Sequence, residues 1–167
     1  QRAYDQLWHD LCLNNLPAVI LDFGSSVYGT SDATHLSFFD LALQGALPNL
    51  RCLAPTCREE YLAMLDWAID QDSRPVVIRV PGNGVVSNPD FALDPKAPAD
   101  FTLPRYDVVH EGSDVAILAL GSFFSLGESL CDALSAPADG GKKRRIHRRR
   151  AVVLRQRELP HRKRRGR

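Results

Sequence analysis

The sequence predicts an α/β fold in which a parallel sheet is flanked by helices. Three short apolar runs, at residues 18–23, 50–54 and 75–80, are typical of buried strands. Stretches with apolar residues at helical spacing precede or separate them, at residues 2–15, 35–43 and 57–71. Helices and strands that alternate at this spacing favour a parallel sheet with right-handed crossovers.

The first helix is expected at Arg2–Asn15, where Asn14 and Asn15 can end it and Pro17 lies just beyond. The strand at 18–23 shows no polar alternation, as expected when both faces are covered, and it contains Asp22 near its end. A loop rich in Gly, Ser and Thr then leads to His35. Loops at the carboxyl ends of parallel strands are where open α/β sheets bind ligands, so this loop is the first candidate site.

The next helix is expected from His35 to Leu43, with Gly45 as its terminator. Thr56 and Glu59 fit a capping box, which predicts a helix from Cys57 to about residue 71. The strand at 75–80 is stopped by the turn residues 81–84.

Four regions follow from these patterns. Residues 1–87 are expected to form the first α/β domain, incomplete at its N-terminus, and residues 88–104, which contain four prolines, are expected to link it to a second domain. Residues 105–136 begin that second α/β domain, with a buried strand at 114–121 and a helix that a capping box at Ser125 predicts to run to about Leu134.

Residues 137–167 differ in charge from everything before them. Residues 1–139 carry 7 Lys/Arg and 19 Asp/Glu, whereas residues 140–167 carry 14 Lys/Arg and one acid, Glu158. A segment so poor in apolar residues is expected to be disordered. A shifted reading frame in a GC-rich gene would produce such arginine runs. As an alternative, the basic segment would bind nucleic acid or an acidic partner, although no aromatic residue for base stacking lies among its basic clusters.

Other motifs carry less information. Asp22-Phe23-Gly24 matches the kinase metal-binding tripeptide, but the catalytic-loop motif and the lysine motif of kinases are missing. The five histidines have no zinc-ligand spacing, the four cysteines indicate a reducing compartment, and no apolar run is long enough for a membrane span. From its position alone, His35 is as consistent with a surface histidine as with a catalytic one.

A family resemblance adds to this. The segment Gln1–Gln6 followed by His9-Asp10 resembles a signature of the 1-deoxy-D-xylulose-5-phosphate synthases, which are transketolase-like enzymes. The similarity continues in order through the matching stretches as far as about Leu134: the strand ending in Asp22, Gly29 to His35, Phe39-Asp40-Leu41, Pro48-Asn49, Ala54-Pro55 and Val77–Pro81. The resemblance implies a partial pyrimidine-binding domain followed by the start of the transketolase C-terminal domain.

The resemblance also implies a function. The intact family enzyme is a cytoplasmic homodimer that uses thiamine diphosphate and Mg²⁺ to decarboxylate pyruvate and to join the two-carbon unit to glyceraldehyde 3-phosphate. It implies that His35 is catalytic, that Arg2, Ser31 and Asp32 bind substrate, and that Arg79 lies near the acceptor's phosphate.

Departures from the family pattern qualify these expectations. The family's activating glutamate and stacking aromatic lie upstream of Gln1, with the diphosphate- and Mg²⁺-binding domain, so we expect neither cofactor to bind this chain alone and the chain alone to be inactive. Phe23 replaces an arginine, and the arginine expected between Pro81 and Gly82 is missing. Another hypothesis is therefore that the chain supplies His35 to a second subunit that carries the cofactor domain.

Overall fold

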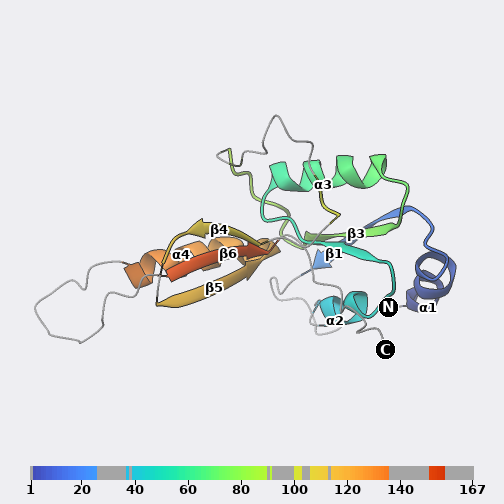
Figure 1. Ribbon diagram of the computed structural model, residues 1–167, viewed down its shortest axis with the longest axis horizontal. Helices are drawn as coiled ribbons and strands as arrows, with labels where there is room; N and C mark the ends of the chain where they lie inside the picture. The colour runs from blue at the N-terminus through green and yellow to red at the C-terminus, as the bar shows by residue number, and fades with distance from the viewer. Residues whose placement is uncertain are drawn as a thin grey trace, which may run out of the picture.

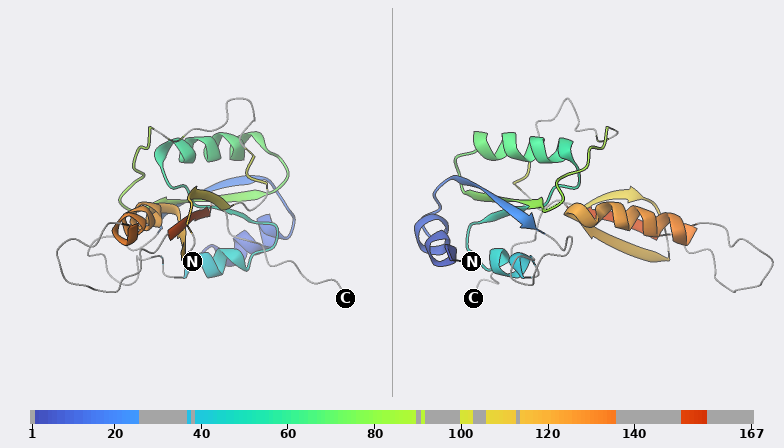
Figure 2. Two further views of the ribbon diagram at one scale, coloured as in Figure 1. Left: turned by 60° about the vertical axis from the view of Figure 1, so that its left-hand side comes forward. Right: turned by 180° about the vertical axis from the view of Figure 1, so that it is seen from behind.

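The computed structural model describes residues 2–25, 37, 39–89, 91, 100–102, 106–112, 114–135 and 151–156. They form two three-stranded sheets that lie side by side, each with helices packed against it (Figures 1 and 2). In the part of the chain that the structure describes, no helix is both long and apolar enough to cross a membrane.

The first sheet is parallel, as predicted, with β3 (Pro75–Pro81) between β1 (Ala18–Ser25) and β2 (Arg51–Leu53). Every residue of β3 is buried, which fits a central strand covered on both faces. Near the end of β1, Gly24 has a φ of 84°, and the register with β3 shifts between Phe23 and Ser25. Glycine is well suited to this irregularity because it adopts positive φ without steric cost.

Helices cover both faces of this sheet (Figure 1). Helix α3 (Arg58–Asp70) lies on one face, where Met64 and Ala68 pack with Val76 and Ile78. On the other face lie α1 (Tyr4–Gln6), the helix η1 (Leu7–Cys12) and α2 (Asp40–Gly45). Their core joins Cys12, Leu47, Leu50, Cys52 and Val77. The three-layer α/β arrangement therefore matches the prediction.

The first helix is not a regular α-helix. After one short turn it continues as a π-helix, in which the amide of Leu13 donates to the carbonyl of Trp8 at 2.8 Å. It ends as expected at the asparagines, where Asn15 has a φ of 51° and its amide donates to the carbonyl of Cys12. Asparagine tolerates this left-handed conformation better than most residues do.

The capping predicted for α3 is shifted by one residue. Cys57 is the N-cap, the helix begins at Arg58, and Glu60 in place of Glu59 accepts hydrogen bonds from the amide and hydroxyl of Thr56 at 2.8 and 2.7 Å. Glu60 is completely buried, so these two donors, which both bond to Oε2, offset part of the cost of placing a carboxylate in the interior.

The second sheet contains β4 (Tyr106–His110), β6 (Ala151–Gln156) and β5 (Val115–Leu120), in that order. Strand β6 runs parallel to β5 and antiparallel to β4. Helix α4 (Phe124–Ser135) packs on this sheet after the 3₁₀ turn η2 (Gly121–Phe123). The capping box expected at Ser125 is therefore wrong, because the chain turns at Gly121, whose φ is 57°, and Ser125 already lies inside the helix.

Two strands were not anticipated from the sequence. The strand β4 lies just after the proline-rich region, and β6 lies within the basic segment that we expected to be disordered. That expectation is wrong for residues 151–156, because the apolar run Ala151–Leu154 pairs with strands on both of its edges. The remainder of the basic segment, residues 136–150 and 157–167, lies outside the described residues.

The region expected to link the domains is attached to the first domain at both ends. The amide of Arg58 donates to the carbonyl of Val86, and Glu59 accepts hydrogen bonds from Ser87 and Asn88. Residues 92–99 lie outside the described part. Beyond them, Phe101 is 1% exposed and its ring meets that of Trp67 edge to face, with the ring centroids 5.8 Å apart. Arg51 also donates to the carbonyl of Thr102.

Candidate functional site

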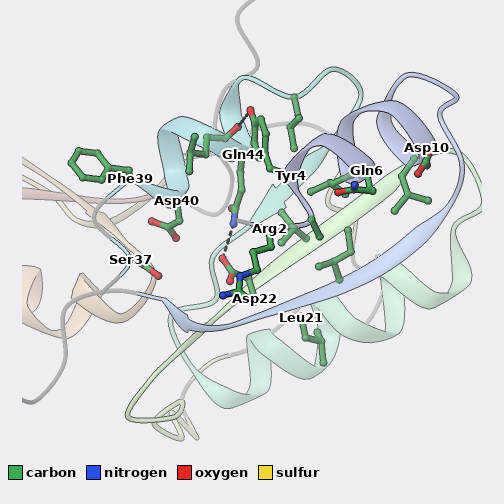
Figure 3. Close-up of a pocket in the computed structure, with 17 residues that line it drawn as sticks. Arg2, Tyr4, Gln6, Asp10, Leu21, Asp22, Ser37, Phe39, Asp40 and Gln44 are labelled. Atoms are coloured by element: carbon green, nitrogen blue, oxygen red, sulfur yellow. Dashed lines mark hydrogen bonds between the residues drawn. The ribbon is translucent and has the colours of Figure 1, made fainter. Parts of the chain in front are cut away.

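A cavity of about 950 Å³ lies between β1 and the helices α1, η1 and α2. Leu7, Ile20 and Leu43 contribute to its apolar walls. Its polar lining, labelled in Figure 3, comes from several elements: Arg2, Gln6 and Asp10 near the N-terminus, Asp22 on β1, and Asp40 and Gln44 on α2. The cavity therefore lies at the polar end of β1, on the face of the sheet opposite α3.

Strand alternation places Asp22 and Arg79 on this face. Asp22 follows Ile20 by two residues and Arg79 follows Val77 by two, and both apolar residues belong to the core on the α2 side. The amide nitrogen Nε2 of Gln44 donates to Oδ2 of Asp22 at 2.6 Å, drawn as a dashed line in Figure 3. Nε of Arg79 donates to Oδ2 of Asp40 at 2.6 Å.

Two further hydrogen bonds join the walls of the cavity. The hydroxyl of Tyr4 donates to the carbonyl of Leu43 at 2.9 Å, which ties α1 to α2. The hydroxyl of Ser37 donates to the carbonyl of Gly24 at 3.1 Å, which ties the chain before α2 to the end of β1. Together these contacts connect the elements that line the cavity.

The site offers hydrogen-bond acceptors and one cation. Oδ1 of Asp40 and Oε1 of Gln44 are buried and have no hydrogen-bond partner among the described residues. Arg2 is the basic residue of the cavity lining, and Figure 3 shows its side chain beside Asp22. In the described ranges, no three or more His, Cys, Asp or Glu side chains gather as they would around a metal ion.

The structure places the predicted site residues differently with respect to the cavity. Arg2 lines the cavity, and its role in binding substrate stays a prediction. Arg79 does not line it: the residue is 8% exposed, and Asp40 is its partner. His35, Ser31 and Asp32 lie outside the described residues, so their roles stay predictions.

The sequence analysis assigned no role to Asp22, Asp40 or Gln44. For Asp22 the sequence did contain an indication, because Asp22 and Arg79 both follow apolar runs in strands that are predicted to be parallel. For Asp40 and Gln44 the only signal was their spacing of four residues, which places both side chains on one side of a helix. Neither signal indicates which strand residue each would bind.

A second cavity of about 660 Å³ lies where the two sheets approach, lined by residues of both domains: Thr56, Cys57, Val86, Ser87, Asn88, Phe91, Val109, Phe124, Ser125 and Glu128. The pKa of the Cys57 thiol is raised, chiefly by burial. A thiol with a raised pKa is a poor nucleophile at neutral pH. Cys57 is therefore better suited to packing than to nucleophilic chemistry.

The chain matches known proteins along most of its described length. A family model, transketolase pyrimidine binding domain, matches residues 1–85. Among curated proteins, 1-deoxy-D-xylulose-5-phosphate synthase from Thermomicrobium roseum is 35% identical over 135 residues, which are 81% of this chain and 21% of that protein. The enzyme of the same name from Clostridium acetobutylicum is 34% identical over 122 residues, 72% of this chain and 19% of that protein. The chain thus spans about a fifth of the length of these relatives.

Solved structures show the same fold. A split-gene transketolase, described as an inactive β4 tetramer, superposes with a TM-score of 0.70 at 25% identity, over 95% of this chain and 45% of that one. A transketolase mutant from Pichia stipitis superposes with a TM-score of 0.66 at 19% identity, over 88% of this chain and 20% of that one. The sequence match, the parallel sheet and the cavity beside β1 agree, and the chain belongs to the transketolase pyrimidine-binding-domain family, with the 1-deoxy-D-xylulose-5-phosphate synthases among its relatives.

Proposed function

We propose that the chain forms part of a thiamine-diphosphate-dependent transferase that makes 1-deoxy-D-xylulose 5-phosphate from pyruvate and glyceraldehyde 3-phosphate. The observation that carries this proposal is the match to synthases of that name over 72–81% of the chain. The four buried free thiols also favour the reducing cytoplasm that such an enzyme would occupy.

The described residues fit one end of the cofactor better than the other. The cavity combines apolar walls with buried acceptors on Asp40 and Gln44, which suit a flat ring that carries an amino group. Mg²⁺ does not fit, because no group of three or more metal-ligating side chains occurs in the described ranges. We therefore propose that the diphosphate and Mg²⁺ bind to another part of a dimeric enzyme.

When bound, thiamine diphosphate supplies the electron sink for decarboxylation of a 2-oxo acid. The proposed task of His35 is to move a proton at the substrate oxygen, with Ser31 and Asp32 as further substrate contacts. Arg2, which lines the cavity, is suited to a substrate carboxylate or phosphate. Phe23 is 70% exposed and uncharged, so we expect weaker binding of the acceptor's phosphate than an arginine there would give.

The first test concerns the chain alone. The purified 167-residue chain, supplied with thiamine diphosphate, Mg²⁺, pyruvate and glyceraldehyde 3-phosphate, is expected to release no CO₂ above background. Steady decarboxylation by this preparation would contradict the proposal that other parts of the enzyme are required.

The second test asks whether the chain can serve in an intact enzyme. Residues 1–135 would replace the matching segment of the Thermomicrobium roseum synthase, with which the chain shares 35% identity. The chimera is expected to make 1-deoxy-D-xylulose 5-phosphate, and His35→Ala in the chimera is expected to lower kcat about 10²- to 10⁴-fold. A chimera that folds and binds thiamine diphosphate but has no turnover would refute the proposed function.

A second candidate is a subunit of a split enzyme. The observation that favours it is the superposition of 95% of this chain on a split-gene transketolase. In this proposal the chain supplies His35 to a second polypeptide that carries the cofactor-binding domain. A neighbouring reading frame whose product co-purifies with this chain and restores turnover would support it, and a chain that elutes alone in the presence of that product would oppose it.

A further inference from the structure

The carboxyl ends of β1 and β3 carry a matched pair of opposite charges. Asp22 and Arg79 are register partners on these neighbouring parallel strands, so their side chains lie on the same face of the sheet. Each of them bonds to a side chain of α2: Asp22 accepts from Gln44, and Arg79 donates to Asp40. We call these four residues the α2 clamp.

The clamp holds α2 at two points, one turn apart. Asp40 and Gln44 are four residues apart, which places both side chains on the same side of the helix. A six-residue helix is too short to be stable alone, so its position depends on tertiary contacts. The remaining described side-chain bond to α2 comes from Tyr4 and reaches only its backbone.

Arg79 makes its contact with α2 from a largely buried position. The side chains of Arg79 and Asp40 are 9% and 12% exposed, and their Nε–Oδ2 distance of 2.6 Å is that of a short charge-assisted bond. Nε carries a single proton, which Asp40 accepts. Asp40 lines the cavity and Arg79 does not, so a ligand in the cavity meets the carboxylate before it meets the guanidinium.

We propose that Arg79 is a positioning residue: through the α2 clamp it holds α2 over the ends of β1 and β3 and thereby sets one wall of the cavity. It does not bind the acceptor's phosphate, in contrast to what the family resemblance led us to expect. The inference rests on the proposed function for its relevance to catalysis, but its tests measure the fold of this chain and not turnover. Failure of the chimera would therefore leave it standing.

The first experiment uses the unmodified chain. In ¹⁵N-resolved NMR spectra, the Nε–H signal of Arg79 is expected to exchange slowly with water and to keep its position when inorganic phosphate or glyceraldehyde 3-phosphate is added. The exposed Arg58 serves as the control for a guanidinium that exchanges rapidly. A saturable shift of the Arg79 signal with either anion would overturn the proposal.

The second experiment compares two buried arginines by hydrogen exchange. Arg79→Lys keeps the charge but loses the Nε donor, and it is expected to speed exchange of the α2 amides about tenfold or more while those of α3 are unchanged. Arg51→Lys is the matched control, since Arg51 is also buried, at 3% exposed against 8% for Arg79, and donates to the carbonyl of Thr102.

The outcomes of this comparison are distinct. Equal acceleration in α2 and α3 would indicate a general loss of stability, and unchanged exchange in α2 would show that Arg79 does not hold it; either result opposes the proposal. Asp40→Asn keeps an acceptor oxygen for Nε–H and is expected to protect α2 better than Asp40→Ala does. If Arg79→Lys does not fold, the proposal is tested by the anion titration of the unmodified chain and by the comparison of Asp40→Asn with Asp40→Ala.

Discussion

At the scale of single residues, the cysteines show how burial sets chemistry. All four are free and buried, and Cys52 lies in the core on the α2 side of the sheet. Burial raises the pKa of the Cys52 thiol to about 12, although the nearby Arg79 and Arg51 oppose the rise. The free-energy cost of removing a thiolate from water exceeds the electrostatic stabilisation by two buried guanidinium groups. Cys52 therefore stays protonated and unreactive.

This shift predicts a loss of stability at high pH. The unfolded chain releases the Cys52 proton near its ordinary pKa of 9.0, whereas the folded chain keeps it until about 12. The contribution is therefore complete below pH 9 and falls progressively as the pH rises toward 12. Urea denaturation of the wild type and of Cys52→Ala should show a stability difference that changes over this window. Parallel curves for the two proteins would contradict the prediction.

At the scale of elements, the first turn of α3 organises the chain that leaves β3. The carboxylate of Glu59 accepts hydrogen bonds from the hydroxyl of Ser87 at 2.5 Å and from the amide of Asn88 at 2.8 Å. These bonds hold the pKa of Glu59 down to about 2. A carboxylate near a helix N-terminus also complements the helix dipole, so one residue serves both the helix and the connection.

Glu59 should therefore make stability depend on acid pH. The contribution is present above the ordinary pKa of 4.5 and is lost as the pH falls through about 2, because protonation removes the charged acceptor. Glu59→Gln should lack this part of the acid dependence, and the exposed Asp66→Asn on the same helix is the control. The measurement is the urea midpoint at each pH. An acid dependence identical in Glu59→Gln and wild type would exclude the proposed role of Glu59.

The second sheet depends on one element, β6. This strand lies between β4 and β5 and pairs with both. Val153→Pro would remove a backbone N–H from a central strand, and it is expected to abolish the protection of β4 and β5 against hydrogen exchange while α3 and β3 stay protected. Val153→Ala keeps the N–H and is the matched control. Persistent protection of β5 in the proline variant would show that β6 is dispensable.

At the scale of the whole molecule, the proline-rich connection is part of the first domain's core. Phe101 is 1% exposed and packs against Trp67 and the cluster that includes Met64 and Ile78. The start of β4 therefore follows a segment that is already fixed to the first domain. This attachment helps to place the second sheet beside the first, where Ala54 lies 3.4 Å from the position that a Cβ would take on Gly121.

Removing this attachment should destabilise the first domain. Phe101→Ala is expected to lower the free energy of unfolding by about 3–5 kcal/mol, since it deletes a buried aromatic side chain and leaves a cavity. Phe123→Ala is the control, because Phe123 is about half exposed and its loss should cost far less. Urea denaturation followed by Trp fluorescence measures both variants. A cost below about 1 kcal/mol for Phe101→Ala would show that the segment is only loosely packed.

The sequence by itself determined the α/β fold, the three parallel strands of the first domain and the family. Apolar runs and helical spacing are local patterns, and a helix or strand largely follows from its own residues. The sequence did not reveal β6, because its apolar run is short and its neighbours are basic. Pairing with two strands stabilises it, and those partners lie far away in the chain.

Only the tertiary structure decided which groups meet. The strand order β1-β3-β2 sets Asp22 beside Arg79, and the return of α2 over both strands gives each of them a different partner. Arg79 has the residue type of a phosphate ligand, and only the fold shows that it lies largely buried against Asp40, the contact on which its proposed positioning role rests. Contacts between residues tens of positions apart depend on how the chain folds back, and composition and spacing do not encode them one at a time.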